Sequence, residues 1–360
     1  GSSVEHAARA RCPGDRHPPL VLAVANVCTG LARILGTIEI KKMRVLITGG
    51  AGFLGSALAN HLVAEGHTVL ALDDLTAGDP RRLSPDVLFN RGDVKDVPKL
   101  WTLLQGVDCV YHLAARVRVP ESIHYPGDYN DVNVGGTVAL MEAVRDTGVR
   151  RVVFASSAAL YGEQAHQPIH EDQTPNPNSP YGVSKIGAEY YVSTLGALYR
   201  IETVSLRIFN AYGPGQELPP SYPPVIPQLL RQAQAGGSLV IFGDGTQTRD
   251  FVYVEDVVTA LVAASTATDV NRAVINVGSG HGISINELAT KVARLAGKRA
   301  SPLLNKAQAA GVSRLVADVK LAKQLLGWTP HTALDDGLRL ILEHDPRFQE
   351  GQGAGTGWNG

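Results

Sequence analysis

The stretch Val45-Leu46-Ile47-Thr48-Gly49-Gly50-Ala51-Gly52-Phe53-Leu54-Gly55 decides the fold. Its first apolar residues predict a short buried strand, and the apolar spacing that follows, through Leu58 and Leu62, predicts a helix. A strand, a glycine-rich turn and a helix in this order are what a dinucleotide-binding fingerprint requires. Gly49 then permits the tight turn, Gly52 lets the backbone approach a pyrophosphate, and Gly55 lets the helix pack closely on the strand. An ordinary turn between a strand and a helix is the alternative.

The next apolar run, Thr68–Leu72, ends in Asp73. An acidic residue about 20 residues after the glycines is where the ribose hydroxyls of a dinucleotide are bound. The carboxylate would repel a 2′-phosphate, so the sequence favours NAD over NADP. This second feature makes the ordinary turn a weak alternative.

The rest of the chain alternates strand-like and helical runs, which predicts an α/β fold with a Rossmann-type doubly wound parallel sheet. A change of organisation near Gly213-Pro214-Gly215 and the proline-rich stretch 219–227 marks a domain boundary. The predicted division is an appended arm over 1–42, an NAD-binding domain over 43–210, a smaller C-terminal α/β substrate domain over 211–345 with some segments returning to the first domain, and a flexible tail over 346–360.

Composition excludes several classes of protein. The 360 residues include 33 Lys plus Arg and 34 Asp plus Glu, so the charge gives no sign of nucleic-acid or membrane binding. Three cysteines without metal or disulfide spacing favour a reducing compartment, the cytoplasm. No metal site is expected. The apolar run Pro19–Ile38 resembles a signal or membrane anchor, but Arg33 interrupts it, which favours an appended arm.

Two further strand ends predict contacts with the cofactor. Asp93, with Val94 beside it, is placed to bind the adenine amino group, or else to cap the next helix. The small-residue exit Leu113-Ala114-Ala115 leaves room for the cofactor ribose. His112, just before it, is interpreted as a satisfied core histidine.

Tyr181 and Lys185 open a predicted helix and are four residues apart, so they share one face. A buried ammonium beside a phenol favours the phenolate and is expected to lower the tyrosine pKa. A phenol with a lowered pKa becomes a general base at neutral pH. The same spacing also occurs by chance on many helices.

These motifs together resemble the extended short-chain dehydrogenase/reductase family, the NAD-dependent nucleotide-sugar epimerases and dehydratases, from Met43 to about Leu342. The resemblance rests on the glycine turn, Asp73, Gly92-Asp93-Val94, His112-Leu113-Ala114-Ala115, Asn133-Val134-x-Gly136-Thr137, Ser156–Gly162, Tyr181-x-x-x-Lys185, Arg207-x-Phe209-Asn210-x-Tyr212-Gly213-Pro214 and Arg249–Val254.

The resemblance implies roles for particular residues. Tyr181 would be the general base, Lys185 would hold it ionised and bond the nicotinamide ribose, and Ser157 would hydrogen-bond the sugar 4-oxygen. Asn210 would hold a substrate phosphate and Arg249 the diphosphate, with an ion pair to Asp250 or Glu255 as the alternative for Arg249. It further implies cofactor contacts from Phe53, Leu54, Val94 and Asn133, substrate contacts from Phe242 and Arg314, and a homodimer.

The chain also departs from the family pattern. Counting back from Asp318 gives Gln308 where galactose-type epimerases carry a phosphate-binding arginine, and Arg314 is a nearby substitute. Leu315 stands where the family has a residue that gates the sugar 2-substituent. Arg116 and Arg118 are unusual neighbours for a neutral sugar.

The reaction is narrowed by Ala158 and Ala159, which follow Ser157. Family dehydratases carry an Asp-Glu pair at these positions, and alanine neither donates nor accepts a proton. The resemblance therefore implies a 4-epimerase that acts on a UDP-hexose, in its Glc/Gal, 2-acetamido or uronic form. The alternatives are an NAD(P)-dependent reductase, an epimerase acting at another carbon, and a non-catalytic NAD-binding sensor or scaffold.

Overall fold

The computed structural model describes residues 42–299, 301–306 and 311–349. The predicted arm, apart from Lys42, and the tail beyond residue 349 lie outside these ranges, as does Gln308.

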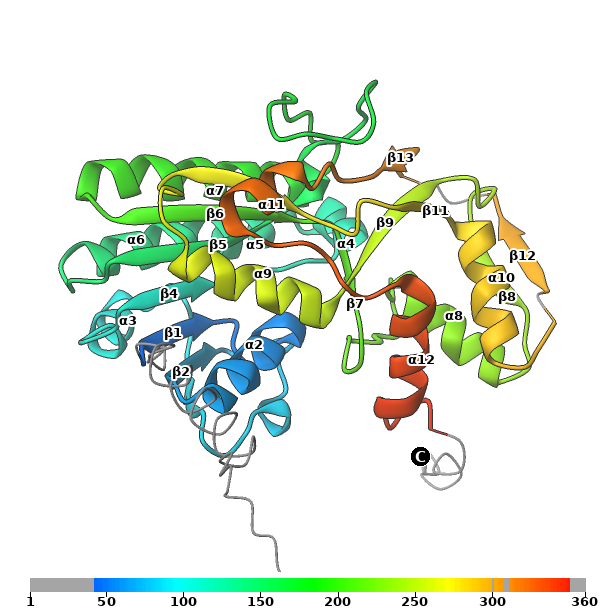
Figure 1. Cartoon of the computed structure of the whole chain (residues 1–360), viewed down its shortest axis with the longest axis horizontal. Helices are drawn as coiled ribbons and strands as arrows, with labels where there is room; N and C mark the ends of the chain where they lie inside the picture. The colour runs from blue at the N-terminus through cyan, green and yellow to red at the C-terminus, as the bar shows by residue number, and fades with distance from the viewer. Residues whose placement is uncertain (1–41, 300, 307–310, 350–360) are drawn as a thin grey trace, which may run out of the picture. The chain divides into compact units, whose positions relative to one another are not determined.

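A parallel sheet of seven strands forms the centre, in the order β10-β6-β5-β4-β1-β2-β3 (Figure 1). This order, which grows outward in both directions from β1 and β4, confirms the doubly wound sheet. Its strands are β1 (Arg44–Thr48), β2 (Thr68–Asp73), β3 (Leu88–Arg91), β4 (Cys109–His112), β5 (Arg151–Ser157), β6 (Glu202–Ile208) and β10 (Ala273–Val277).

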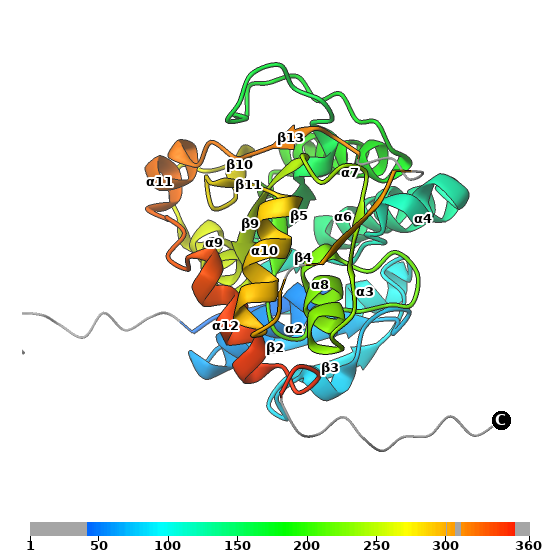
Figure 2. The same ribbon diagram turned by 90° about the vertical axis from the view of Figure 1, so that its right-hand side faces the viewer.

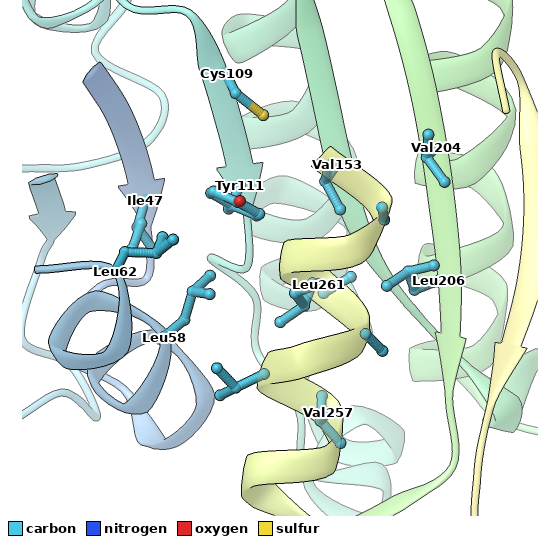
Figure 3. Close-up of a cluster of buried hydrophobic side chains, with 14 of the residues drawn as sticks. Ile47, Leu58, Leu62, Cys109, Tyr111, Val153, Val204, Leu206, Val257 and Leu261 are labelled. Atoms are coloured by element: carbon cyan, nitrogen blue, oxygen red, sulfur yellow. The ribbon is translucent and has the colours of Figure 1, made fainter. Parts of the chain in front are cut away.

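Apolar residues alternate between the two faces of this sheet, as the strand period requires. Val45 and Ile47 of β1 pack with helices α2 (Phe53–Ala64) and α9 (Val254–Thr266) on one face (Figure 3). Leu46, between them, belongs to the core on the other face. That face is covered by α3 (Val97–Leu103), α6 (Gly136–Arg145) and α7 (Pro180–Tyr199).

A second region is built on β9 (Thr248–Tyr253), which pairs with β7 (Asn210–Tyr212), β11 (Gly282–Ser284) and β13 (Arg314–Leu315). Figure 2 faces the helices of this region. They share their own apolar core. The other elements here are α8 (Val225–Gln234), α10 (Ile285–Leu295), α12 (Leu334–His344) and the two-stranded sheet of β8 (Leu239–Phe242) and β12 (Pro302–Asn305).

The chain crosses between the two regions after the expected boundary near residue 210. Helix α9 and strand β10 follow β9 in sequence, yet they complete the first sheet and its covering layer. Helix α11 (Lys320–Leu326) also packs there, next to β10 and α9.

The helical segment over residues 126–145 is a composite. It consists of α5 (Pro126–Asn130), a π-helical turn over Asp131–Gly135 and α6. Such π-helical turns are frequent at functional sites, and this one carries Asn133. The short α4 (Val119–His124) precedes it, and 3₁₀ turns lie at Pro80–Arg82 and Ala158–Leu160.

The end of the described chain is packed, although it falls in the segment expected to be a flexible tail. Phe348 is 3% exposed and belongs to the core of the second region. Gln234 donates a hydrogen bond to the Phe348 carbonyl at 2.6 Å. Residues 346–349 are therefore fixed by burial of an aromatic ring, a contact that tail composition does not reveal.

No helix among the described residues is both long enough and apolar enough to cross a membrane.

Candidate active site

The glycine turn has the geometry that the fingerprint requires. Gly49 has a φ of +70°, a conformation that strongly favours glycine. A methyl group at Gly55 would lie 2.0 Å from the Gly49 carbonyl oxygen, so a side chain there would push the helix off the turn. Gly52 is the N-cap of α2 and offers no side chain, and the first turn of the helix holds no acidic residue. The first N–H groups of α2 are thus left for an anionic ligand.

Asp73 joins the turn to the end of β2. Its two carboxylate oxygens accept hydrogen bonds from the Ala51 N–H at 3.0 Å and the Leu75 N–H at 2.8 Å. Burial raises the pKa of Asp73, and these hydrogen bonds oppose the shift. Asp73 therefore braces the turn while it faces the cavity described next.

A cavity of about 560 Å³ extends from the glycine turn toward β7. It is lined by nearly all the residues expected to bind the cofactor, namely Gly49, Gly52, Phe53, Leu54, Gly55, Asp73, Asp93, Val94, Leu113, Ala114 and Ala115. Asn210 lines it as well, whereas Asn133, Ser157, Tyr181 and Lys185 do not. An elongated cavity that starts at a helix N-terminus fits a dinucleotide.

Helix α3 is capped by Asp96, whose side chain accepts from the Lys99 N–H, so the alternative of a helix cap at Asp93 is wrong. Asp93 instead braces the turn before that helix. Its carboxylate accepts a hydrogen bond from the Lys95 N–H at 2.8 Å, while the residue still lines the cavity. A turn-bracing role and a contact with adenine are therefore compatible.

We expect Asp73→Ala to weaken NAD binding by on the order of 1–3 kcal/mol and to reduce discrimination against NADP, because a charged hydrogen-bond acceptor is lost. Titration of cofactor-free protein with NAD and with NADP measures both effects. Asp86→Ala is the matched control, since Asp86 is exposed and lies outside the lining of the cavity. Equal NAD affinity in Asp73→Ala and the parent would reject the role.

The expected catalytic residues converge at the end of β5. Tyr181, 8% exposed, forms a side-chain hydrogen bond with Ser157. Lys185, one turn further along α7, is 3% exposed and has its ammonium 4.6 Å from the centre of the Phe154 ring. No described residue forms a hydrogen bond with that ammonium. A buried ammonium without a hydrogen-bond partner fits a site that receives ribose hydroxyls.

Burial dominates the electrostatics of this group. It lowers the pKa of Lys185 to about 7, and Glu189 opposes this shift. It raises the pKa of Tyr181, and the hydrogen bond from Ser157 opposes that. The expected lowering of the Tyr181 pKa is thus wrong for the chain without ligand, because desolvation of the phenolate outweighs its neighbours.

Two residues that the sequence patterns did not single out fix the position of Tyr181. The Tyr181 N–H donates to Ser122 Oγ at 3.2 Å. The Tyr129 ring meets the Tyr181 ring edge-on, with the ring centres 6.4 Å apart. Both belong to α4 and α5, which follow the end of β4, and no local spacing connects them with Tyr181.

Asn133 lies behind the wall of the cavity and links that wall to α7, the helix that carries Tyr181 and Lys185. It is 2% exposed, and its amide bonds both the N–H and the carbonyl of Arg116 as well as Ser184 Oγ. Arg116 lines the cavity and Ser184 lies in α7, so Asn133 sets the distance between them. In this structure Asn133 braces the wall of the cavity and is not part of its lining.

His112 is a satisfied core histidine, as expected. Its ring nitrogens bond Thr48 Oγ1 at 2.7 Å and Thr137 Oγ1 at 2.9 Å. Burial lowers its pKa to about 3, so it stays neutral.

The expected substrate residues are more widely spread. Asn210 lines the cavity and donates to the Asp250 carbonyl at 2.9 Å. Arg249 lies in β9 in register with Ile283 and Leu315, and burial lowers its pKa. Phe242 ends β8, and Arg314 is exposed in β13. The structure brings Asn210 to the cavity and leaves Phe242, Arg249 and Arg314 outside its lining.

Asp250 is the alternative ion-pair partner of Arg249, but its contacts give it a different structural role. Asp250 is fully buried and accepts hydrogen bonds from Ser279 at 2.6 Å and from the Gly280 and Ala317 N–H groups. These bonds tie β9 to the exit of β10 and to the chain beyond β13. Asp250 thus holds the segments around Arg249 together.

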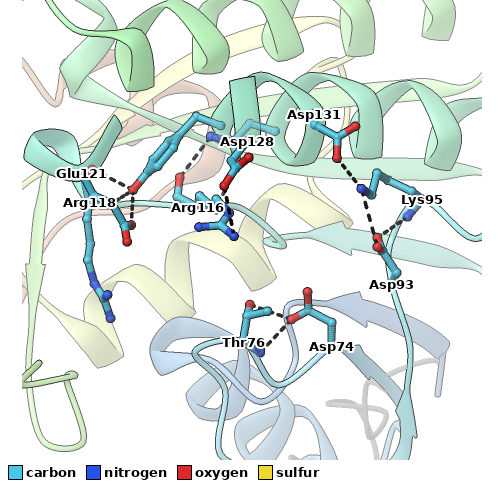
Figure 4. A network of polar contacts seen from close by, with 11 residues as sticks. Asp74, Thr76, Asp93, Lys95, Arg116, Arg118, Glu121, Asp128 and Asp131 are labelled. Atoms are coloured by element: carbon cyan, nitrogen blue, oxygen red, sulfur yellow. Dashed lines mark hydrogen bonds and ion pairs between the residues drawn. The ribbon is translucent and has the colours of Figure 1, made fainter. Parts of the chain in front are cut away.

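Arg116 and Arg118 both line the cavity and are both paired with acids. Figure 4 shows the polar contacts around them. Arg116 lies 3.8 Å from Asp128, and Arg118 lies 3.2 Å from Glu217. Glu217 escapes sequence reasoning because it lies 99 residues away, in a proline-rich stretch without a motif.

Among the described residues, no group of three or more His, Cys, Asp or Glu side chains is arranged to hold a metal ion.

Comparison with known proteins identifies the family of the chain. The model of the NAD dependent epimerase/dehydratase family matches residues 45–278. A UDP-glucose 4-epimerase from Mycolicibacterium smegmatis is 37% identical over 308 residues, which cover 84% of this chain and 98% of that protein.

Two solved structures are similar over most of their length. The UDP-glucose 4-epimerase of Thermotoga maritima with UDP-glucose has a TM-score of 0.80 and 32% identity, covering 84% of this chain and 98% of that one. The UDP-glucuronic acid 4-epimerase of Bacillus cereus with UDP-glucuronic acid and NAD has a TM-score of 0.77 and 32% identity, with the same coverage. The chain belongs to the NAD dependent epimerase/dehydratase family.

Proposed function

We propose that this protein is an NAD-dependent isomerase that inverts C4 of a UDP-hexose through a transient 4-keto sugar. The observation that carries the proposal is the set formed by Tyr181, Ser157 and Lys185, followed directly by two alanines. Ala158 is 2% exposed and Ala159 follows it in the same turn. Tyr181 is the proposed base, and Ser157 and Lys185 assist it. The two alanines provide no second acid or base.

Tyr181, Ser157 and Lys185 have different roles in this reaction. The Tyr181 phenolate oxygen takes the proton of the sugar 4-hydroxyl and returns it at the end of the cycle. Ser157, bonded to Tyr181, holds the 4-oxygen beside it. The Lys185 ammonium stabilises the phenolate and bonds ribose hydroxyls. When bound, NAD would supply the hydride acceptor and would be regenerated in each cycle.

Inversion needs no further proton transfer, because the ketone turns over and receives hydride on its other face. Loss of the 6-hydroxyl in a dehydratase would need a base for the C5 proton and an acid for the leaving oxygen. Ala158 and Ala159 can serve as neither. A reductase at the same site would consume reduced cofactor, which gives a simple way to tell it apart.

The region after residue 210 is proposed to hold the UDP part of the substrate. Support comes from Asn210 at the cavity and from the half-buried Arg249, whose planar guanidinium suits diphosphate oxygens better than an ammonium does. Phe242 and Arg314 are proposed to contact the nucleotide, with Arg314 in place of the arginine missing at Gln308.

Mass spectrometry of the ligands released from denatured protein tests the proposal. We expect NAD to be released together with a UDP-sugar, and turnover to need no added NADH. Stoichiometric consumption of reduced cofactor would identify a reductase instead. A retained cofactor without any turnover of UDP-sugars would favour a sensor or scaffold.

We further propose a homodimer formed through α7 and the helices beside it. Val183 and Tyr190 are seven residues apart on α7, and Leu198 follows near its end, with exposures of 55%, 59% and 70%. Ile123 and Tyr125, near α4, are also mostly exposed. An exposed apolar stripe of this size is typical of a helix that packs against a symmetry mate.

Light scattering at micromolar concentration should therefore give the mass of a dimer. Leu198→Asp should shift the protein toward the monomer by burying a charge in the interface. Leu88→Asp, at an equally apolar and half-exposed position on β3, is the control and should leave the mass unchanged. A monomer mass for the parent would contradict the proposal.

A further inference from the structure

An ion pair spans two segments that line the cavity. Arg118, after β4, and Glu217, after β7, have Nη2 and Oε2 3.2 Å apart. Their side chains are 32% and 25% exposed, so the pair is partly desolvated. In Figure 4 the Arg118 side chain extends away from α4 and α5.

The backbone of Arg118 is fixed close to the proposed base. Tyr129 Oη donates to the Arg118 carbonyl at 2.7 Å and accepts from the Arg118 N–H at 3.0 Å. The same Tyr129 ring contacts the ring of Tyr181. One aromatic side chain therefore lies between the Arg118 backbone and the phenol. Because Arg118 and Glu217 both line the cavity, their ion pair belongs to the part of the cavity wall that adjoins the proposed base.

The charges in this neighbourhood are matched. Arg118 faces Glu217 and Arg116 faces Asp128. Glu121 Oε2 lies 2.8 Å from Tyr129 Oη and shares the one hydroxyl hydrogen of Tyr129 with the Arg118 carbonyl. Each of these two arginines is therefore already paired with an acid, and neither is free to bind a carboxylate of the substrate.

An apolar cluster adjoins Ser157, the residue proposed to hold the sugar 4-oxygen. Leu315, 8% exposed, packs in one cluster with Ala158, beside Ser157, and with Phe209, which lines the cavity. UDP-hexoses vary chiefly at the 2-substituent, which is uncharged in both the hydroxyl and the acetamido form, and at C6, which is a hydroxymethyl group or a carboxylate. Of these groups, the carboxylate alone responds strongly to an ion pair.

We propose that the Arg118–Glu217 pair determines specificity at C6 and selects a neutral hexose over a uronate. The inference rests on the proposed C4 epimerase function and assigns its substrate class. Glu217 acts as a repulsive element, because a sugar carboxylate near Arg118 would also lie near a second negative charge. Glu217 further occupies the guanidinium, whose fork would otherwise bond the carboxylate through two N–H groups.

The test compares kcat/KM for UDP-glucose and UDP-glucuronate in the parent and in Glu217→Gln. We expect the parent to prefer UDP-glucose and the variant to lower the ratio of the two constants by about tenfold or more, mainly through a lower KM for the uronate. Arg118→Met/Glu217→Gln should lose that gain, because the cation responsible is gone. Asp128→Asn, which releases Arg116 instead, is the matched control and should change the ratio much less.

The outcomes separate this inference from the function on which it rests. A parent that inverts C4 of neither sugar removes the proposed function and the inference together. A parent active on UDP-glucose with an unchanged ratio in Glu217→Gln contradicts the inference alone. So does a uronate gain that persists in the double variant, or an equal gain in Asp128→Asn. Thermal unfolding and NAD titration show that each variant is folded before its ratio is used.

Discussion

Tyr181→Phe is expected to lower the rate of C4 inversion by about 10²–10⁴-fold, the usual contribution of a general base. Phenylalanine keeps the ring that contacts Tyr129 and removes the oxygen that bonds Ser157. The fold and the binding of nucleotide should remain, because neither Asp73 nor the glycine turn contacts this oxygen. Initial rates with a UDP-hexose that the parent epimerises measure the loss.

Tyr191→Phe is the matched control for this experiment. Tyr191 lies on the same helix but is 45% exposed, so loss of its hydroxyl should leave the rate near that of the parent. If Tyr181→Phe kept a rate close to the parent, the assignment of the base would be wrong.

Arg207→Met is expected to reduce the free energy of unfolding by about 3–5 kcal/mol, because it leaves a buried carboxylate without its partner. Arg207 bonds Glu189 at 2.7 Å, and the two side chains are 5% and 2% exposed. Arg207 also donates to Tyr161 Oη at 2.8 Å. Glu189 further accepts from Ser156 Oγ at 2.6 Å, in the strand that ends in Ser157.

Urea unfolding followed by circular dichroism measures this effect. Arg207→Met/Glu189→Gln should recover part of the loss, since the unpaired charge is removed. Arg145→Met serves as the control, because the Arg145–Asp146 pair is exposed and surface pairs contribute little. An unchanged unfolding midpoint in Arg207→Met would show that the network does not support the fold.

Features that depend on local order could be predicted from the sequence. The glycine turn, Asp73 and the Tyr181–Lys185 pair each lie within one strand–turn–helix unit or one helical turn, so their spacing carries the geometry. The doubly wound parallel sheet was predicted in the same way, from the alternation of strands and helices. Comparison with relatives confirmed the family and its cofactor.

Features that join distant segments could not be predicted. Asn133 had the right position in the sequence, but its part in bracing Arg116 against Ser184 depends on packing across 51 residues. The Arg118–Glu217 pair joins two strand exits 99 residues apart. The direction of the Tyr181 pKa was mispredicted because spacing reveals a neighbouring charge but not the extent of burial. Glu189 lies four residues after Lys185, so the helical spacing could have predicted that its charge acts on Lys185.

The most direct test of the proposed function follows the configuration at C4 by NMR after UDP-glucose is added to the protein without any added cofactor. We expect an equilibrium mixture of UDP-glucose and its C4 epimer, with the hydrogen at C4 retained from the substrate. A 4-keto-6-deoxy product, or a product that forms only as NADH is consumed, would contradict it.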